Sequence, residues 1–451
     1  MITHAKPRPR QSVTPSRVAA AAIMRGVRQG QLLDQAFDGA VRNLDARDRR
    51  WVQELCWGTM RTRGLLDSWL ADRVKGGLDR LDADLVDQLR LGAYQLRYMD
   101  SVPPYAAIGQ TVELVKDVVG VGAAGLANAV LRRLDRERAT LDELPTDPDA
   151  VTQLAARYSH PRWLVARWVS RWGQEATQAL LAANNTEAPL GIRPVGTDEA
   201  RLALHDALAA AGLQVQEAPF ALDGWEVRGA SVIPDLPGFS EGAFFVQDPA
   251  AALVASYAAV PAGAIVLDLC AAPGGKAIAL SRTARLVIAA DRAPARLARV
   301  GENVRRLRID NIHGVVADAL LPPVTAVDAV LVDAPCSGTG TFRRHPDARW
   351  RLKPSDLAVT CDAQREILEA ASRCVRPGGL LVYSTCSLEW EENEAMVAAF
   401  LQSHPAFVLE PPPAGAVPDD TMRDGYLTVS PILAGTDGAF AARLRRRVNE
   451  P

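Results

Sequence analysis

Short apolar runs that alternate with helix-like segments constrain the fold of this chain more than any other feature. The runs are AIVLDLC (264–270), LVIAAD (286–291), GVVAD (314–318), DAVLVDAP (328–335) and GLLVYST (379–385). Helix-like segments such as 293–307 and 361–375 separate several of them. Strands that are apolar throughout are buried on both faces, and the intervening helices cover those faces. The pattern predicts a doubly wound α/β domain with a mostly parallel sheet over residues 241–451.

The N-terminal part has a different periodicity, which predicts an all-helical domain over residues 15–140. Apolar residues recur at helical spacing in two series, Leu85, Leu89, Gly92 and Leu96, then Ile108, Val112, Val115 and Val119. Pro103-Pro104 predicts a break between these two helices. Residues 1–14 are predicted to be a flexible tail. Residues 141–240 are predicted to hold a linker, a further helix and a small α+β module.

Composition narrows the class of protein. The chain has 451 residues, which suggests about three domains. Its six cysteines include no CxxC pair, so we expect reduced thiols and no metal site. No apolar run is long enough to span a bilayer, and no signal-peptide core follows the first residues, so a cytoplasmic protein without a membrane partner is expected. Residues 1–63 hold 12 Lys and Arg against 5 Asp and Glu, which is compatible with a polyanionic partner.

The run LDLCAAPGGKA (267–277) reads as a strand, a sharp turn and a helix start. Gly274 and Gly275 would let the backbone approach a ligand closely. The run matches neither the P-loop nor the GxGxxG pattern. Asp291 ends the next strand and is placed to accept the hydroxyls of a ribose, and Asp318 could accept an adenine amine. These features predict a nucleoside site without a phosphate cradle, as S-adenosylmethionine requires. The alternative is that such acids only cap helices.

Two cysteines stand just past strand ends. Cys336 follows Asp333-Ala334-Pro335, and Cys386 follows Ser384-Thr385. A free cysteine is more often a small buried hydrophobe than a nucleophile. Beside a nucleoside site, however, a thiolate can add to carbon 6 of a cytosine, after which carbon 5 is electron-rich enough to attack a methyl group. Such a reaction needs an unstacked base and an acid near ring N3 or N4, for which Asp333 is the candidate.

The motifs CAAPGGK, DAPCSGTG and TCS…EENE, together with Asp291 and Asp318, resemble those of the RsmB/Sun (Fmu) RNA cytosine-5 methyltransferases of the RsmB/NOP family. The resemblance implies a Rossmann-like class I methyltransferase domain that binds S-adenosylmethionine. It implies Cys386 as the nucleophile and Cys336 as an aid to product release, with Lys276 near the thiolate. The cofactor-binding residues that it implies are Cys270, Ala271, Ala272, Pro273, Gly274, Gly275, Lys276, Asp291, Asp318 and Asp333.

The helical region resembles the NusB-type RNA-binding domain that is fused to members of this family. The stretches that carry the resemblance are 49–67, 89–116 and 125–137. The fusion implies 16S rRNA as the substrate, either naked or in an early 30S assembly intermediate. A methyltransferase for tRNA or large-subunit rRNA is a second hypothesis. A non-catalytic RNA-binding or antitermination protein is a third, which the intact cysteines and Gly turn disfavour.

Two basic segments are candidates for RNA contact. In RYSHPRWLVARWVSRWG (157–173), arginines alternate with tryptophans, either to bind RNA or, as we favour, because the tryptophans pack into a core. The segment RRHPDARWRLK (343–353) is predicted to be a basic loop at the rim of the site. Arg343, Arg344 and Arg349 are predicted there as phosphate contacts.

Overall fold

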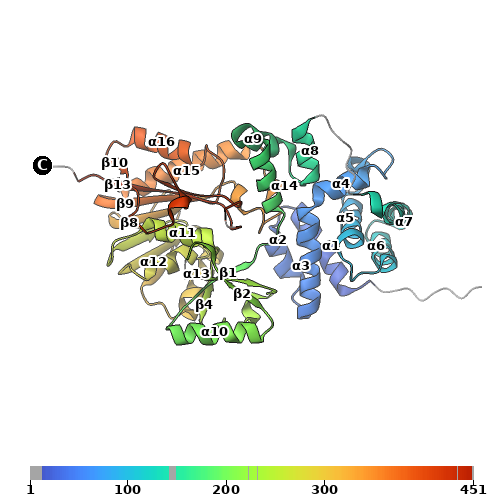
Figure 1. Ribbon diagram of the computed structural model, residues 1–451, viewed down its shortest axis with the longest axis horizontal. Coiled ribbons are helices and arrows are strands. Elements are labelled where there is room, and N and C mark those ends of the chain that lie inside the picture. The colour runs from blue at the N-terminus through green and yellow to red at the C-terminus, as the bar shows by residue number, and fades with distance from the viewer. Residues whose placement is uncertain (1–12, 142–148, 222, 231, 434, 449–451) are drawn as a thin grey trace, which may run out of the picture. The chain divides into compact units, whose positions relative to one another are not determined.

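The computed structural model describes residues 13–141, 149–221, 223–230, 232–433 and 435–448 (Figure 1). The chain divides into two compact units. The first comprises Met1–Asn185 with His345–Trp350, and the second comprises Thr186–Arg344 with Arg351–Pro451. Most of the predicted tail and linker falls on 1–12 and 142–148, outside the described residues. The predicted domain boundaries near residues 140 and 240 stay a prediction.

The first unit is helical, as predicted. Its α-helices are α1 (Pro15–Arg28), α2 (Leu33–Ala40), α3 (Ala46–Arg61), α4 (Arg63–Ala71), α5 (Ala83–Tyr98), α6 (Pro104–Val118), α7 (Val121–Arg136), α8 (Ala150–Arg157) and α9 (Arg162–Asn184). Pro104 is the first residue of α6, so the break predicted at Pro103-Pro104 is confirmed. Helix α5 lies against α1, α3, α4, α6 and α7, and most of its residues are buried.

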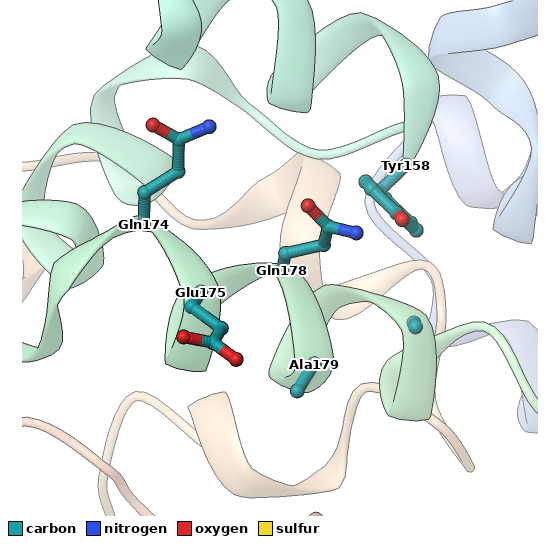
Figure 2. A pocket seen from close by; sticks show the side chains of 6 residues that line it. Tyr158, Gln174, Glu175, Gln178 and Ala179 are labelled. Atoms are coloured by element: carbon teal, nitrogen blue, oxygen red, sulfur yellow. The ribbon is translucent and has the colours of Figure 1, made fainter.

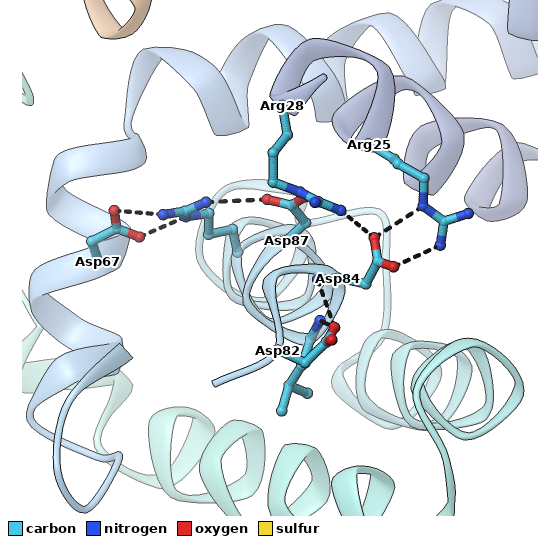
Figure 3. A network of polar contacts seen from close by, with 8 residues as sticks. Arg25, Arg28, Asp67, Asp82, Asp84 and Asp87 are labelled. Carbon is cyan, nitrogen blue, oxygen red and sulfur yellow. Dashed lines mark hydrogen bonds and ion pairs between the residues drawn. The ribbon is translucent and has the colours of Figure 1, made fainter. Parts of the chain in front are cut away.

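Because α5 is buried on most sides, its polar residues need partners from the helices around it. Figure 3 shows how they are satisfied. Arg28 of α1 donates to Asp87 over 2.9 Å, and Arg25 of α1 pairs with Asp84 over 3.0 Å. On the other side, Arg90 makes a two-pronged pair with Asp67 of α4, at 2.6 and 2.9 Å. These pairs fix the positions of α1 and α4 against α5.

The second unit begins with the small α+β module that the sequence predicted. Its four-stranded antiparallel sheet has the order β2-β3-β1-β4. The strands are β1 (Leu190–Pro194), β2 (Gln214–Glu217), β3 (Trp225–Arg228) and β4 (Phe244–Val246), and α10 (Asp198–Ala210) packs on them. The module core includes Ile192, Leu204 and Trp225. Three of its pairings, β1 with β3, β1 with β4 and β2 with β3, are antiparallel.

A nine-stranded sheet forms the centre of the second unit, with the order β11-β12-β13-β9-β8-β5-β6-β7 and β10 beside β13. Its strands are β5 (Ile265–Asp268), β6 (Leu286–Asp291), β7 (Ile312–Val316), β8 (Val327–Asp333), β9 (Val375–Thr385), β10 (Phe407–Leu409), β11 (Met422–Arg423), β12 (Tyr426–Val429) and β13 (Ala439–Arg446). The five predicted strands β5 to β9 are parallel. The sheet is nevertheless mixed, because four antiparallel strands extend the β9 edge.

Helices cover both faces of this sheet. In Figure 1, α11 (Pro249–Ala258), α12 (Gly275–Ser281) and α13 (Pro294–Arg306) lie on one face, and α15 (Asp356–Arg373) and α16 (Glu394–Ser403) lie on the other. Successive strand residues alternate between two cores: Leu331 packs toward α11 and α12, while Val330 packs toward α15. This alternation explains why the strands are apolar throughout. In the described part of the chain, no helix has the length and apolarity to cross a membrane.

Candidate active site

The predicted site residues of the second unit gather at the carboxyl ends of the parallel strands. Strands β9, β8, β5, β6 and β7 are adjacent in that order and run in the same direction. The two cysteine loops follow β8 and β9, the Gly turn follows β5, and Asp291 ends β6. Asp318 lies two residues beyond the end of β7. The order therefore places the two thiol loops side by side, with the Gly turn between them and Asp291.

The turn after β5 brings the backbone close to its neighbours. Gly274 has a φ of +106° and directly precedes α12, and a Cβ there would lie 3.1 Å from a Val300 methyl carbon. A side chain at this position would be both strained and crowded. Ala271 and Ala272 are buried, and the Ala272 N–H reaches the Asp291 carboxylate over 3.4 Å. The structure therefore ties the turn to the acid at the end of β6.

Two of the predicted acids also act as turn caps. Asp291 accepts the backbone N–H of Ala293 over 2.9 Å, just before α13, and Asp318 accepts that of Leu320 over 2.9 Å. Asp291 is almost fully buried, whereas Asp318 is exposed. Both residues thus close turns, but neither caps a helix, because α13 begins without a side-chain cap and the described residues directly after Asp318 form no helix.

Asp268 is a site residue that sequence reasoning missed. It ends β5 and is fully buried, and among the described residues neither carboxylate oxygen finds a hydrogen bond of good geometry. Burial raises the pKa of Asp268 to about 7, and the charge of Asp333 raises it too, while Lys276 and the backbone N–H of Cys270 lower it. The signal was present in the sequence as an acid inside the apolar run LDLC.

Lys276 and Asp333 form an ion pair between the Gly turn and the loop after β8. The Lys276 Nζ lies 2.7 Å from an Asp333 oxygen, and the Ser384 hydroxyl donates to the other oxygen over 2.9 Å. Burial lowers the pKa of Lys276, but Asp333, helped by Cys386 and Asp268, raises it by more. Lys276 is therefore positively charged, and it lies close enough to Cys386 for the two groups to interact electrostatically. Burial also raises the pKa of the Cys270 thiol, to about 12.

The thiol groups of the two predicted cysteines lie in contact. The Sγ atoms of Cys336 and Cys386 are 3.4 Å apart although 50 residues separate them in the chain. The hydrogen bond with Cys386 raises the pKa of Cys336 well above its usual value, and burial adds to the effect. Cys336 is thus protonated at neutral pH.

Glycines allow the loops that carry these thiols to approach. Gly340 lies in the 3₁₀ turn Thr339–Thr341, where it donates its N–H to the Cys386 carbonyl over 2.9 Å. The Gly438 N–H in turn donates to the Gly340 carbonyl over 2.8 Å. A Cβ on Gly340 would lie 2.6 Å from the Cys386 oxygen and 2.8 Å from the Gly438 Cα. These backbones can pack this closely only without side chains between them.

The predicted basic rim needs correction. Arg343 is buried and bonds the Gly435 carbonyl, and Arg344 bonds Asp437, Asp248 and the Pro189 carbonyl. These guanidinium groups therefore bind partners within the second unit, with Arg343 buried and Arg344 partly exposed. That Arg343 and Arg344 contact phosphates stays a prediction.

Arg349 is likewise no rim residue, because it is fully buried within the first unit. It donates to the carbonyls of Ser159 and Asn184 and to the side chain of Asn185, at 3.3, 3.0 and 2.8 Å. Burial lowers the pKa of Arg349 to about 9. A basic run gives no sign of buried acceptors elsewhere in the chain, which is why the sequence misled here.

The other basic segment, 157–173, also belongs to the first unit. Trp168 is buried and Trp172 is exposed, with Arg171 stacked over the Trp172 ring at 4.9 Å. Burial of Trp168 supports the packing interpretation. After a kink at Gly173, α9 lines a hollow of about 400 Å³ with Gln174, Glu175 and Gln178 (Figure 2). None of the predicted site residues lines this hollow.

Comparisons with known proteins agree with this architecture. The family model "16S rRNA methyltransferase RsmB/F" matches residues 258–445, the NusB family matches 14–136, and the ferredoxin-like domain of the RsmF/B methyltransferases matches 160–232. Ribosomal RNA small subunit methyltransferase B of Vibrio cholerae is 37% identical over 86% of this chain and 89% of its own length. The chain belongs to the RsmB/F family of RNA methyltransferases. The family resemblance and the fold class predicted from the sequence are thereby confirmed.

Other relatives cover nearly the whole chain. The probable ribosomal RNA small subunit methyltransferase B of Synechocystis is 33% identical over 96% of this chain and 99% of its own length. Among solved structures, that of PH0851 is 26% identical, covers 97% of this chain and 100% of its own, and has a TM-score of 0.80. A methyltransferase homologue from Pyrococcus horikoshii is 26% identical over 67% of this chain, with a TM-score of 0.53. The similarity to these relatives therefore covers the NusB part, the ferredoxin-like part and the methyltransferase part of this chain.

Proposed function

We propose that this protein methylates carbon 5 of a cytosine in 16S rRNA through a transient bond between Cys386 and carbon 6 of the ring. The observation that carries the proposal is the pair of thiols 3.4 Å apart. They lie in the loops after two neighbouring strands, beside the Lys276–Asp333 ion pair and the Gly turn. A single reactive thiol would suffice for a nucleophile. A second thiol at this distance suits a reaction in which the enzyme must also be released.

S-adenosylmethionine is the proposed cofactor, and it would supply an electrophilic methyl group on a sulfonium sulfur. The residues present fit such a molecule. The turn at Gly274 and Gly275 carries no side chain that would keep a ligand from its backbone, and Asp291 and Asp318 offer acceptors for ribose hydroxyls and an adenine amine. The buried oxygens of Asp268 could accept hydrogen bonds from the ammonium group of the methionyl part. Cys270 through Lys276 complete the proposed binding segment.

The chain's own residues prepare the pyrimidine. Cys386 gives its proton to water, and the resulting thiolate donates an electron pair to carbon 6, which turns carbon 5 into a nucleophile. Lys276 is positively charged and lies close enough to Cys386 for the two groups to interact electrostatically. Asp333, held by Lys276 and Ser384, is available to hydrogen-bond the ring near N3 or N4. The base reaches the site only when unstacked from its helix.

Release requires that the proton on carbon 5 leaves and that the C6–S bond breaks, with the electron pair returning to Cys386. We assign the proton acceptance to Cys336. The bond from Cys386 is the largest cause of the raised pKa of Cys336. Once Cys386 is a thioether, that cause is gone, and Cys336 ionises more readily. The two thiols therefore act in sequence, and the first step prepares the second.

The proposal of 16S rRNA as the substrate rests on the similarity to related proteins. Relatives named small subunit methyltransferases share both the methyltransferase part and the NusB part of this chain. Bisulfite sequencing of total RNA, with and without the protein, distinguishes 16S rRNA from the tRNA and large-subunit alternatives. A cytosine that resists bisulfite conversion only when the protein is present, and only in 16S rRNA, supports the proposal, and such a cytosine in tRNA or 23S rRNA refutes the substrate. A naked transcript and an early 30S particle, compared as substrates, identify the preferred form.

The chemistry is tested by replacing each thiol separately. Cys386→Ala should abolish methyl transfer and form no RNA adduct while S-adenosylmethionine still binds. Cys336→Ala should accumulate an RNA-linked protein band on denaturing gels. Cys374→Ala is the matched control, because that thiol bonds the Val324 carbonyl away from the two loops, and it should retain turnover. Full activity of Cys386→Ala would refute the proposed nucleophile.

A further inference from the structure

The peptide segment that carries Cys336 is held on both sides by one buried carboxylate and its partner. Glu392, which is fully buried, accepts the backbone N–H of Ser337 over 2.9 Å and also accepts the Ser337 hydroxyl. Gln364 of α15 donates to Glu392 over 3.1 Å and to the Pro335 carbonyl over 2.9 Å. The residues directly before and after Cys336 are thus bonded to the Glu392–Gln364 pair.

The residue next to Glu392 holds the other thiol in the same way. The Asn393 side chain accepts the Thr385 hydroxyl over 2.6 Å and donates to the Ser387 carbonyl over 2.9 Å. Thr385 and Ser387 are the immediate neighbours of Cys386. Asn393 is itself almost fully buried, so these bonds form where water cannot replace them.

The two held segments are also joined to each other. The hydroxyls of Ser337 and Ser387, each one residue past its cysteine, are 3.1 Å apart. The Thr339 hydroxyl accepts the Leu388 N–H over 2.8 Å. The Tyr383 hydroxyl, at the end of β9, donates to the Glu392 carbonyl over 2.7 Å and so fixes the backbone of the Glu392–Asn393 pair.

We infer that Glu392 and Asn393 are positioning residues with separate tasks: Glu392 sets the place of Cys336, and Asn393 sets the place of Cys386. This inference rests on the proposed function, because it assigns one residue to the release step and the other to the addition step. Two neighbouring side chains in one turn thereby fix the distance between the two thiols. Neither residue touches the reacting atoms, and each acts through the loop that it holds.

The separate tasks predict that the two variants lose different steps of the reaction, adduct release in one and adduct formation in the other. Without Glu392, Cys336 is displaced, while Cys386 keeps the hydrogen bonds that Asn393 makes to its neighbours. Glu392→Ala should therefore form the RNA adduct at nearly the normal rate and release it slowly. A displacement near 1 Å slows such a step roughly 10- to 100-fold. Asn393→Ala should instead form the adduct roughly 10- to 100-fold more slowly and accumulate none.

The experiment measures adduct formation in a single turnover, adduct release, and S-adenosylmethionine affinity for full-length variants with the 16S rRNA substrate. Glu392→Gln and Asn393→Asp each keep part of the bonding and should recover part of the affected rate. Glu366→Ala, which removes an exposed carboxylate from α15, is the control and should match wild type. If Glu392→Ala does not fold, Gln364→Ala removes the bonds to Pro335 and Glu392 but leaves the bonds from Ser337 to Glu392, and it should also raise the trapped fraction.

The outcomes separate this inference from the proposed function. Adduct trapped by Glu392→Ala but not by Asn393→Ala supports it. Equal losses in both variants without trapped adduct, while Cys336→Ala does trap it, overturn the inference and leave the proposed function intact. If Cys336→Ala itself traps nothing and turns over normally, the release step is wrong and the inference falls with it.

Discussion

Replacing Gly340 by alanine tests whether close backbone packing sets the position of Cys386, the proposed nucleophile. Gly340 donates its N–H to the carbonyl of Cys386 itself, over 2.9 Å. The added Cβ would lie 2.6 Å from that same carbonyl oxygen and 2.8 Å from the Gly438 Cα. Both contacts are with backbone atoms, which cannot rotate away as a flexible side chain would.

The size of the effect follows from the displacement. A relaxed carbon–oxygen contact needs about 3.3 Å, so the Cys386 segment or the Gly340 turn must shift by about 0.7 Å. Crowding of this kind costs roughly 1–3 kcal/mol of folding free energy. A nucleophile displaced by a large fraction of an ångström loses roughly 10- to 100-fold in rate. We therefore expect a mild loss of stability and a large loss of turnover.

The assay compares methyl transfer, S-adenosylmethionine affinity and thermal unfolding of Gly340→Ala with those of Gly301→Ala. Gly301 lies in α13, and a Cβ there meets nothing within 4 Å, so alanine should leave activity unchanged and stabilise the helix slightly. In Gly340→Ala, turnover should fall while cofactor affinity stays within twofold of wild type. Undiminished turnover, or a loss of cofactor affinity as large as that of turnover, would refute the reasoning.

Two further substitutions test the electrostatics of the second unit. An acid whose pKa is raised in the folded state stabilises the fold below its unfolded pKa, and this contribution is lost as the pH rises toward the folded pKa. Burial raises the pKa of Asp268 to about 7, so Asp268→Asn should gain stability relative to wild type between about pH 4 and 7, by up to about 4 kcal/mol. A difference in unfolding free energy that stays constant across this pH range in urea unfolding would contradict the assignment. Asp437→Ala removes one carboxylate that bonds Arg344, at 3.0 Å, and leaves that of Asp248 as a partner, so the unfolding free energy should fall by about 1–3 kcal/mol. Asp362→Ala breaks an exposed pair instead and should change nothing measurable, and equal effects of these two substitutions would show that the Arg344 pair is not structural.

Much of the fold could be predicted because burial leaves a direct trace in the sequence. The parallel strands are buried on both faces, so each appears as an apolar run, and β6 coincides with the predicted 286–291. Strand β7 begins at Ile312, two residues earlier than predicted, because its exposed His313 interrupts the apolar run. The edge strands β10, β11 and β12 are only two to four residues long, too short for a periodic signal.

The parts that sequence reasoning missed depend on partners far apart in the chain. Arg349 reads as one more solvated cation, yet its acceptors lie some 165 to 190 residues away. Asp268 reads as part of a strand, and only the surrounding helices and strands exclude water from it. The thiol pair could be named from its motifs, whereas the distance of 3.4 Å depends on β8 and β9 being neighbours.

The order of the strands also explains why one lysine can serve both halves of the site. The thiol loops follow β9 and β8, the Gly turn follows β5, and Asp291 follows β6, so β5 stands between the half with the thiols and the half suited to a nucleoside. Lys276 begins α12 on the β5 side and reaches across to Asp333 at the end of β8. The Lys276–Asp333 ion pair therefore ties the Gly turn after β5 to the loop after β8 that carries Cys336.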